Sequence, residues 1–516
     1  MIKHLVIAGG GTAGWMTAAM FCHFFKSSDV KITLIESEDI GTVGVGEATI
    51  PHLRYFNETI GLNEHDFMRE TNATFKLGIE FANWKEQKHS YIHPFGSMGF
   101  EANNVPFYRY WSRAKDIGLK ADADVFSIAT QMAKKGRFIY PSQKGHHLAS
   151  TFSYAFHIDS SRYAAMLRKF CENSFPNFTR VEGKIHQVEI DNITGDITSL
   201  NLENNAVIKG DFFIDCSGFR SLLLSQSLGA KEVDLTQYLP CDSAIAAPTN
   251  DIYPDMPYSR ATAHTAGWQW KIPLRHRTGN GCVYASQYMS DDEALAHFKK
   301  GLSGELLAEP SFIKFKARHM SESWIKNCAA IGLSSGFLEP LESTGIHLIQ
   351  TAIMKLTELL PNHKNYTQER KEFNYQMHDE YEKIRDFLIL HYRTSKRQDS
   401  EFWRYIQNMP LPESLQQRIA LIRDHGIFDT YSHGLFLESS WAYVYYAQGG
   451  KSNAPYHKTE HLDDAALLSQ MVNFEKEIIQ YADTLPDQSI MLNKIYEGAA
   501  KEKWPTAAMN FYGVFS

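Results

Sequence analysis

Residues 342–345 place a carboxylate, two hydroxyls and a glycine directly before a periodic segment. The order is Glu342, Ser343, Thr344, Gly345. Apolar residues then repeat at helical spacing: Ile349, Ile353, Leu356 and Leu360. Either hydroxyl could cap this helix, whose first amides would offer donors and partial positive charge to an anion. The segment therefore predicts a capped helix, an anion site, or both, and the carboxylate alone would favour the helix dipole only slightly.

Two tryptophans alternate in the segment 267–273, which ends in Ile272 and Pro273. Alternation places Trp268 and Trp270 on one face of an extended strand. Two flat rings side by side form a wall. An arbitrary pair of this kind most often packs inside a core, so other motifs must decide whether this wall borders a ligand.

The N-terminus carries a dinucleotide-binding pattern. An apolar run at 3–8 is followed by Gly9, Gly11 and Gly14 in GxGxxG spacing, a helical stretch and a second apolar run. The first glycine permits a tight turn, the second lets backbone amides approach a pyrophosphate, and the third lets helix and strand pack closely. This order predicts a strand–helix–strand unit that binds a dinucleotide.

Three further residues complete this nucleotide pattern. Thr12 and Ala13 open the helix whose N-terminus would face the phosphates. Glu36 ends the second apolar run and is the expected acceptor for a ribose hydroxyl. An acidic residue at this place favours FAD or NAD over NADP.

A second pattern favours FAD. The apolar run before Asp215-Cys-Ser-Gly218 resembles the second fingerprint of FAD monooxygenases, although an isolated turn of this composition is common. The strand that begins at Ile185 takes the place that backs the adenine in such folds. No second GxGxxG appears, so we expect the electrons to arrive on flavin reduced by another protein.

The overall composition excludes several classes of protein. A net charge of −7 argues against nucleic acid or an anionic membrane surface as the main partner. No apolar run approaches the roughly 20 residues that a bilayer requires. The six cysteines form no Cys-x-x-Cys pair, which fits a cytoplasmic protein. His146-His147 lack a recognisable carboxylate partner, so we predict a solvated loop and no metal.

Longer patterns set the expected domains. Amphipathic helical patterns occupy 366–391 and 464–483. We expect an α/β (α+β) fold with an FAD-binding, Rossmann-like, monooxygenase-type lobe over 1–360. A mostly helical substrate lid would span 361–516, completed by an insertion near 100–175.

Together these motifs resemble the flavin-dependent tryptophan halogenases. The family signature Gly-Trp-x-Trp-x-Ile-Pro stands at 267–273, Lys-Leu-Gly-Ile-x-Phe-x-x-Trp at 76–84, and a flavin strap at 41–51. The resemblance covers nearly all of residues 1–360. It implies that the tryptophan wall keeps the organic substrate off the flavin.

The resemblance also implies roles for single residues. Lys76, which alone would be expected on the surface, becomes the essential amine that holds hypohalous acid. Glu342 would polarise this electrophile and accept the proton lost from the aromatic ring. Thr344 and Gly345 would bind the halide beside the flavin.

The remaining implied contacts fall into two groups. The additional cofactor contacts are Val45, Ala48, Ile185, Leu338 and Ile346. The substrate contacts are Ile50, Pro51, His93, Phe95, Ser343 and Trp441, with Trp268 and Trp270. The lid at 435–449 resembles relatives whose natural substrates are unassigned.

The implied reaction is halogenation of an electron-rich aromatic, tryptophan or another indole. It would use chloride or bromide, O₂ and FAD supplied reduced by a separate flavin reductase. An FAD-dependent aromatic hydroxylase and a non-catalytic flavin-binding sensor are the alternatives. A homodimer is left open.

Overall fold

The first of two large sheets carries the N-terminal pattern. The computed structural model describes residues 2–39, 46–360, 366–428, 434–453 and 456–498. The strand order of this sheet is β20 (Trp324–Ile325), β21 (Cys328–Ala330), β12 (Phe212–Asp215), β1 (His4–Ala8), β2 (Lys31–Glu36) and β8 (Phe178–Glu182). β1 pairs in parallel with both β2 and β12, as a crossover through a helix requires.

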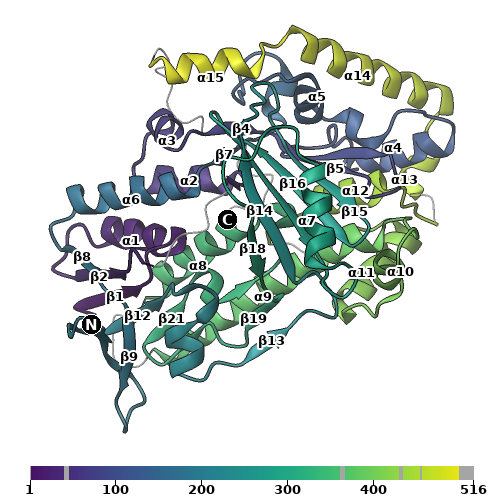
Figure 1. The fold of residues 1–516 in the computed structure, drawn as a ribbon. Helices are drawn as coiled ribbons and strands as arrows, with labels where there is room; N and C mark the ends of the chain where they lie inside the picture. The colour runs from purple at the N-terminus through teal and green to yellow at the C-terminus, as the bar shows by residue number, and fades with distance from the viewer. Residues whose placement is uncertain (1, 40–45, 361–365, 429–433, 454–455, 499–516) are drawn as a thin grey trace.

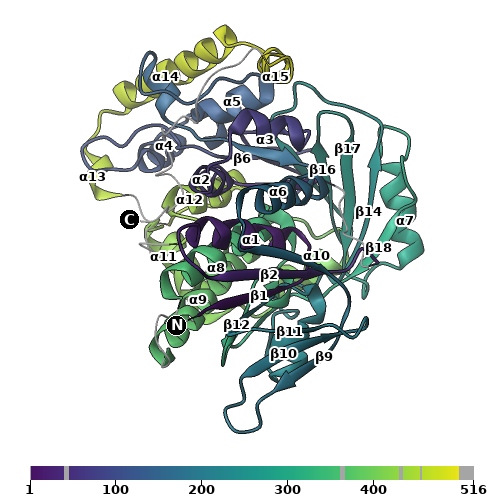
Figure 2. The same cartoon turned by 90° about the vertical axis from the view of Figure 1, so that its left-hand side faces the viewer.

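Helices and a small sheet cover the two faces of this parallel core. Figure 2 shows α1 (Thr12–Phe24) and α8 (Gly345–Leu359) on one side of the sheet. The other side carries a three-stranded sheet of β9 (Ile185–Ile190), β10 (Ile197–Leu202) and β11 (Val207–Lys209). Buried apolar residues such as Val6, Leu200 and Phe213 fill the space between the two sheets. The lobe is therefore Rossmann-like, and the predicted α/β class is confirmed.

The second large sheet has seven strands and contains the tryptophan segment. Its order is β18 (Ser311–Lys314), β14 (Ser243–Thr249), β17 (Thr278–Tyr284), β16 (Gly267–Pro273), β15 (Ser259–His264), β5 (Gly78–Ala82) and β6 (Ser90–Pro94). The predicted strand is β16, which pairs antiparallel with β15 and β17. β4 (Thr74–Lys76) lies just before β5 and pairs with β7 (Ala155–Ile158). The sheet thus brings the lysine segment and the tryptophan segment into one layer.

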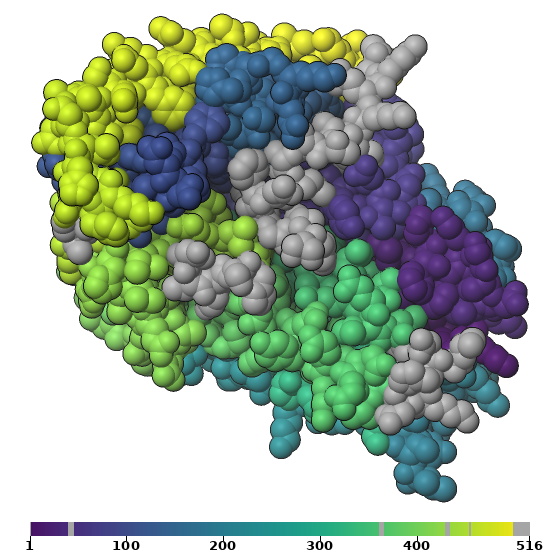
Figure 3. Space-filling model, turned by 180° about the vertical axis from the view of Figure 1, so that it is seen from behind, coloured from purple at the N-terminus to yellow at the C-terminus, as the bar shows by residue number. Residues whose placement is uncertain are grey.

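The C-terminal part is helical, as the periodic patterns predict. It comprises α9 (Thr367–Arg393), α10 (Glu401–Asn408), α11 (Glu413–His425), α12 (Glu438–Ala447), α13 (His457–Glu460), α14 (Asp464–Thr484) and α15 (Gln488–Tyr496). α14 packs against α4 (Phe107–Asp116) and α5 (Ile128–Lys135), and Figure 3 shows the yellow C-terminal helices beside this blue segment. α6 (Ser160–Ser174) instead packs on α1. The segment near 100–175 therefore serves both parts of the molecule, and the boundary at 360/361 stays a prediction.

Two global expectations can be compared with the structure. All six cysteines lie in the described part of the chain, and each is buried and free of disulfides. Among the described helices, none has both the length and the apolar character that crossing a bilayer requires.

Candidate active site

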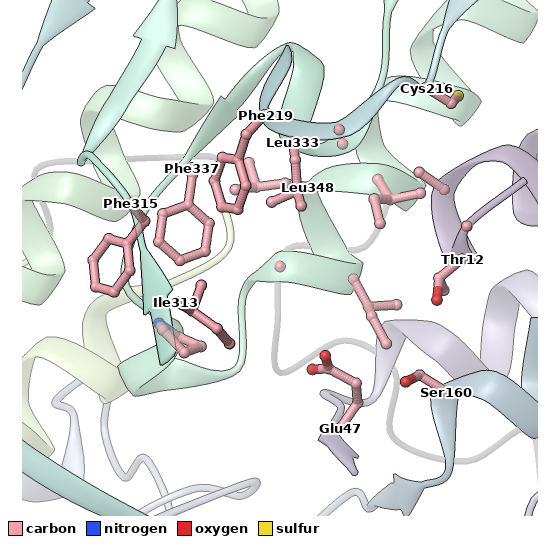
Figure 4. A pocket seen from close by; sticks show the side chains of 18 of the residues that line it. Thr12, Glu47, Ser160, Cys216, Phe219, Ile313, Phe315, Leu333, Phe337 and Leu348 are labelled. Carbon is pink, nitrogen blue, oxygen red and sulfur yellow. The ribbon is translucent and has the colours of Figure 1, made fainter. Parts of the chain in front are cut away.

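A cavity of about 880 Å³ runs from the glycine-rich turn to the tryptophan strand. Figure 4 shows part of its lining. This volume lies in the range typical of cofactor pockets, roughly 300–1,000 Å³. The predicted cofactor residues that line it are Gly9, Gly11, Thr12, Ala13, Glu36, Ala48, Ile185, Gly218, Leu338 and Ile346. Trp268, Trp270, Ser343 and Gly345 line it as well. Val45 lies outside the described residues.

The glycine turn fits the backbone approach that a dinucleotide needs. Gly9 has φ +122°, and a Cβ on it would sit 2.2 Å from the carbonyl oxygen of Cys216. A Cβ on Gly14 would sit 1.8 Å from the oxygen of Gly9. At Gly11 a Cβ would meet no atom within 4 Å, because this residue borders the cavity. The close contacts at Gly9 and Gly14 fix the shape of the turn. The open space at Gly11 leaves room for a pyrophosphate, such as that of FAD, at the start of α1.

Glu36 lies at the end of β2 with its carboxylate held in place. Trp15 Nε1 donates to Oε2 at 3.1 Å, and the Arg180 guanidinium bonds Oε1. A Cβ on Gly10 would come within 1.8 Å of Oε2, so only glycine permits this position. The carboxylate faces the cavity and retains lone pairs for a ribose hydroxyl.

Replacing Glu36 with Ala is expected to weaken FAD binding by roughly tenfold or more, because a charge-assisted hydrogen bond to the ribose is lost. Quenching of flavin fluorescence during titration measures the Kd. Glu182→Ala is the matched control, because Glu182 also bonds Arg180 but does not line the cavity. Equal losses in both variants would assign the effect to Arg180 and not to the ribose contact.

Asp215 and Gly14, which belong to the two predicted cofactor-binding motifs, do not line the cavity. Asp215 accepts hydrogen bonds from the amides of Ser217, Leu223 and Leu224 at 2.8–2.9 Å. Burial raises the pKa of this carboxyl, against the lowering effect of those bonds. Asp215 therefore shapes the turn that places Gly218 against the cavity.

The two tryptophans form the wall expected from their alternation. Their ring centroids are 6.0 Å apart, and the rings are inclined at 54°. Trp270 covers Gly281 so closely that a Cβ there would lie 1.8 Å from Cζ2. Trp268 Nε1 donates to Glu339 Oε2 at 3.4 Å. Burial raises the pKa of Glu339 to about 7.

Lys76 is completely buried, unlike most lysines. Its Nζ donates to the Thr49 carbonyl at 3.0 Å and to Ser343 Oγ at 2.8 Å, and it lies 5.1 Å from the centroid of the Phe95 ring. Burial lowers the pKa of Lys76 to about 7, although the charge of Glu342 opposes the shift. The amine is thus available in both protonation states near neutral pH.

Glu342 is buried between two histidines. His93 Nδ1 lies 2.9 Å from Oε1 and 3.1 Å from Oε2. His391 Nε2 lies 2.7 Å from Oε1, in an orientation off the ideal hydrogen-bond direction. Burial alone would raise the pKa of Glu342, but the charge and hydrogen bond of His93 and the close His391 ring lower it to about 2. The carboxylate is therefore ionised at neutral pH.

A directional chain of hydrogen bonds orients His391. The Gln448 amide nitrogen donates to the His391 carbonyl at 2.9 Å and to Tyr91 Oη at 3.3 Å. Tyr91 Oη can then donate to His391 Nδ1, 3.1 Å away. This order leaves the ring proton on Nε2, which faces Glu342. The sequence offered no sign of this chain, because its members belong to β6, α9 and the end of α12.

The helix start at Thr344 differs from the expected cap. Thr344 occupies the N-cap position of α8 without a side-chain cap bond, and its buried Oγ1 has no hydrogen-bond partner. Ser343 lies in the left-handed region, φ 59°, and its hydroxyl accepts from Lys76 instead of capping the helix. The free amides of α8 and an unpartnered hydroxyl thus remain for an anion beside Gly345.

Lys76, Glu342, His93 and Ser343 form a buried polar group, the Lys76–Glu342 cluster. The other predicted substrate residues lie near this cluster. Ile50 and Pro51 directly follow Thr49, whose carbonyl accepts from Lys76. The Arg418 guanidinium carbon lies 3.6 Å above the ring centroid of Trp441. Trp441 also meets Phe387 edge-on, with ring centroids 5.2 Å apart. Phe387 in turn lies 5.6 Å from His93, measured between ring centroids. Lys76, Glu342, His93, Phe95 and Trp441 do not line the 880 Å³ cavity.

The cavity residues that had no predicted role in binding include three phenylalanines and a glutamate. Figure 4 shows Phe219, Phe337 and Phe315 in a row along one side, with neighbouring centroids 5.3 and 5.0 Å apart. Glu47 lies on the other side, and burial raises its pKa to about 7. Phe219 and Phe337 directly adjoin the predicted cofactor residues Gly218 and Leu338, and Glu47 lies in the strap at 41–51. These three could have been found from sequence, whereas Phe315 could not.

One expectation about metal binding is wrong in its premise. His146 and His147 do have a carboxylate beside them, because α14 brings Glu477 to 3.8 Å from His146 Nε2 and 3.2 Å from His147 Nε2. The residues are more than 300 positions apart, so local spacing could not reveal the contact.

Comparisons with known proteins place this geometry in context. The family model described as tryptophan halogenase matches residues 4–464. The tryptophan 6-halogenase SttH of Streptomyces toxytricini is 34% identical over 515 residues, 94% of this chain and 96% of that protein. The tryptophan 7-halogenase RebH of Lentzea aerocolonigenes is 32% identical, with 82% of each chain covered. The solved structure of BrvH, a flavin-dependent halogenase from Brevundimonas sp. BAL3, matches with 39% identity and a TM-score of 0.92, covering 96% of this chain and 99% of that one.

Proposed function

Because this chain belongs to the tryptophan halogenase family, we propose that it halogenates tryptophan or another indole with chloride or bromide. FAD reduced by a separate flavin reductase supplies, with O₂, the oxidising equivalents that turn halide into hypohalous acid. One observation carries the proposal: the large cavity and the Lys76–Glu342 cluster are separate, and Ser343 borders both. A hydroxylase, which reacts directly at the flavin, has no need of this separation.

The start of α8 is the proposed halide site. Gly345 lines the cavity, and Thr344 brings a buried hydroxyl that has no other partner. A helix of 15 residues gives its N-terminus partial positive charge, which favours an anion. Halide held here would lie on the cavity side of Ser343.

Lys76 is the proposed carrier of the hypohalous acid. Its amine is desolvated and fixed by two acceptors, so it can donate a hydrogen bond as ammonium or react as a free amine. Its bond to Ser343 places it at the junction between the cavity and the buried cluster. The reagent is thereby delivered to the substrate side of the tryptophan wall.

Glu342 is the proposed base for the aromatic ring. Transfer of the halogen from hypohalous acid leaves a cationic ring and releases hydroxide, which leaves as water with a proton from the Lys76 ammonium. Loss of the ring proton to a base then gives the halogenated aromatic. An ionised carboxylate can stabilise that cation and accept the proton. His93 and the chain Gln448–Tyr91–His391 hold Glu342 in its charged form.

The proposal is tested by incubating the protein with FAD, a flavin reductase, NADH, bromide and either tryptophan or indole. We expect a brominated product with at least one of the two substrates. A hydroxylated product that forms without halide would support the hydroxylase alternative. Flavin binding without O₂ consumption or turnover would support the sensor alternative.

A further inference from the structure

Three metal-ligating side chains meet where β19 (Arg318–Met320) packs against α9 (Figure 1). They are His319 on the strand and His378 and Glu382 on the helix. Their ligand atoms all lie within 4.8 Å of one another. This cluster is separate from the Lys76–Glu342 cluster and shares no side chain with it.

His319 directs a ring nitrogen without a hydrogen bond toward the other two residues. Its Nδ1 lies 2.9 Å from the Met320 carbonyl oxygen, which can only accept, so Nδ1 carries a proton. Its Nε2 is fully buried, lies 3.5 Å from Glu382 Oε1 and has no hydrogen-bond partner. A neutral ring in this tautomer would set a lone pair against a carboxylate oxygen, and a cation between them removes the repulsion. A backbone carbonyl on the far ring nitrogen is also the usual support of a metal-bound histidine.

The helix supplies the other two ligands from one face. His378 and Glu382 are four residues apart on α9, so their side chains lie one turn apart on the same side. Arg385 bonds Oε2 of Glu382, which leaves Oε1 for a metal. The Arg385 charge is shared with Asp386, to which its Nε and Nη2 also donate.

Packing holds the buried ligand in place. The His319 ring stacks on Tyr381, with centroids 5.2 Å apart and planes 15° apart. A Cβ on Gly336 would lie 2.8 Å from both the Cβ of His319 and the Cζ of Tyr381, so β19 and α9 pack closely around this glycine. His378 is exposed and free to turn toward the ion.

We propose that His319, His378 and Glu382 bind a divalent transition-metal ion, Zn²⁺ by ligand type, with water completing the shell. Ligands about 2.1 Å from Zn²⁺ lie roughly 3.4 Å apart in a tetrahedron. His378 can supply most of the contraction by rotation. The ion would tie β19, and through it β22 (Gly336–Phe337), to the helix that carries His391.

The experiment titrates the metal-free full-length protein with Zn²⁺ by calorimetry and with Co²⁺ by visible absorbance. We expect one ion per chain at this site, with Co²⁺ bands typical of low coordination number. Zn²⁺ should also raise the Tm of the wild type. His378→Ala should weaken binding about tenfold or more and remove the rise in Tm, and it should fold, since His378 is exposed.

Two further variants make the assignment specific. Glu382→Gln keeps the shape of the side chain and should weaken binding as His378→Ala does. The double variant His146→Ala/His147→Ala removes the exposed cluster with Glu477. It should leave Zn²⁺ binding by His319, His378 and Glu382 unchanged. The proposal is overturned if the wild type binds Zn²⁺ no more tightly than His378→Ala, or if only the double variant loses the ion.

Discussion

A Lys76→Met variant is expected to consume O₂ at nearly the wild-type rate with FAD, reductase and NADH, while its yield of halogenated aromatic falls roughly 10²-fold or more. The reason is positional. The Lys76 amine lies outside the large cavity, bonded to Thr49 and Ser343, so its removal leaves the flavin pocket unchanged. Methionine keeps the length and packing of the stem. Oxygen uptake and product analysis on the same sample measure both quantities.

Stability distinguishes this result from simple misfolding. The folded-state pKa of Lys76, about 7, lies below its ordinary value of 10.5. Protonation therefore penalises the folded state below pH 10.5, most fully below pH 7, and the penalty disappears as the pH rises between these values. Lys76→Met should consequently have a Tm at pH 6 no lower than that of the wild type. A large loss of FAD affinity would instead make Lys76 a cofactor residue. That result would contradict the separation of the large cavity from the Lys76–Glu342 cluster.

The sequence predicted those parts of the site that are encoded in short, local patterns. The glycine turn, Glu36 and the Trp268–Trp270 strand each combine residue type with regular spacing. The structure forms the strand and places Gly9, Gly11, Glu36 and both tryptophans along the cavity, and their ligand contacts stay predictions. Asp215 belongs to the predicted turn but does not line the cavity, because a short motif does not show which way a carboxylate points. Its oxygens bind backbone amides inside the turn.

The buried polar cluster could be predicted only in part. Resemblance identified Lys76 and Glu342, but nothing in the sequence indicated that His391 lies 2.7 Å from the carboxylate. His391 sits within an amphipathic helix pattern, where a histidine is unremarkable by itself. Its contact depends on how α9 packs against β6, which is set by long-range packing and not by local spacing.

Glu342→Gln is the second variant from which we expect a large effect. The substitution keeps shape and hydrogen bonding but removes the charge, so we expect kcat to fall by about 10²- to 10⁴-fold with little change in KM for the aromatic. The folded-state pKa of Glu342, about 2, lies below the ordinary 4.5. Its contribution to stability is therefore complete above pH 4.5 and is lost as the pH falls toward 2. Between pH 4.5 and 2, the Tm of Glu342→Gln should therefore fall less steeply than that of the wild type.

Glu339→Gln is the matched control within the same segment. Glu339 is also buried, but its pKa is raised to about 7, so at pH 6 it is mostly protonated and glutamine closely resembles it. The Trp268 indole can still donate to the amide oxygen. At pH 6 we therefore expect Glu339→Gln to keep kcat within a few-fold of the wild type, while Glu342→Gln loses it. Equal losses in the two variants would show that the segment responds to any change in packing, and the assignment of Glu342 as the base would fail.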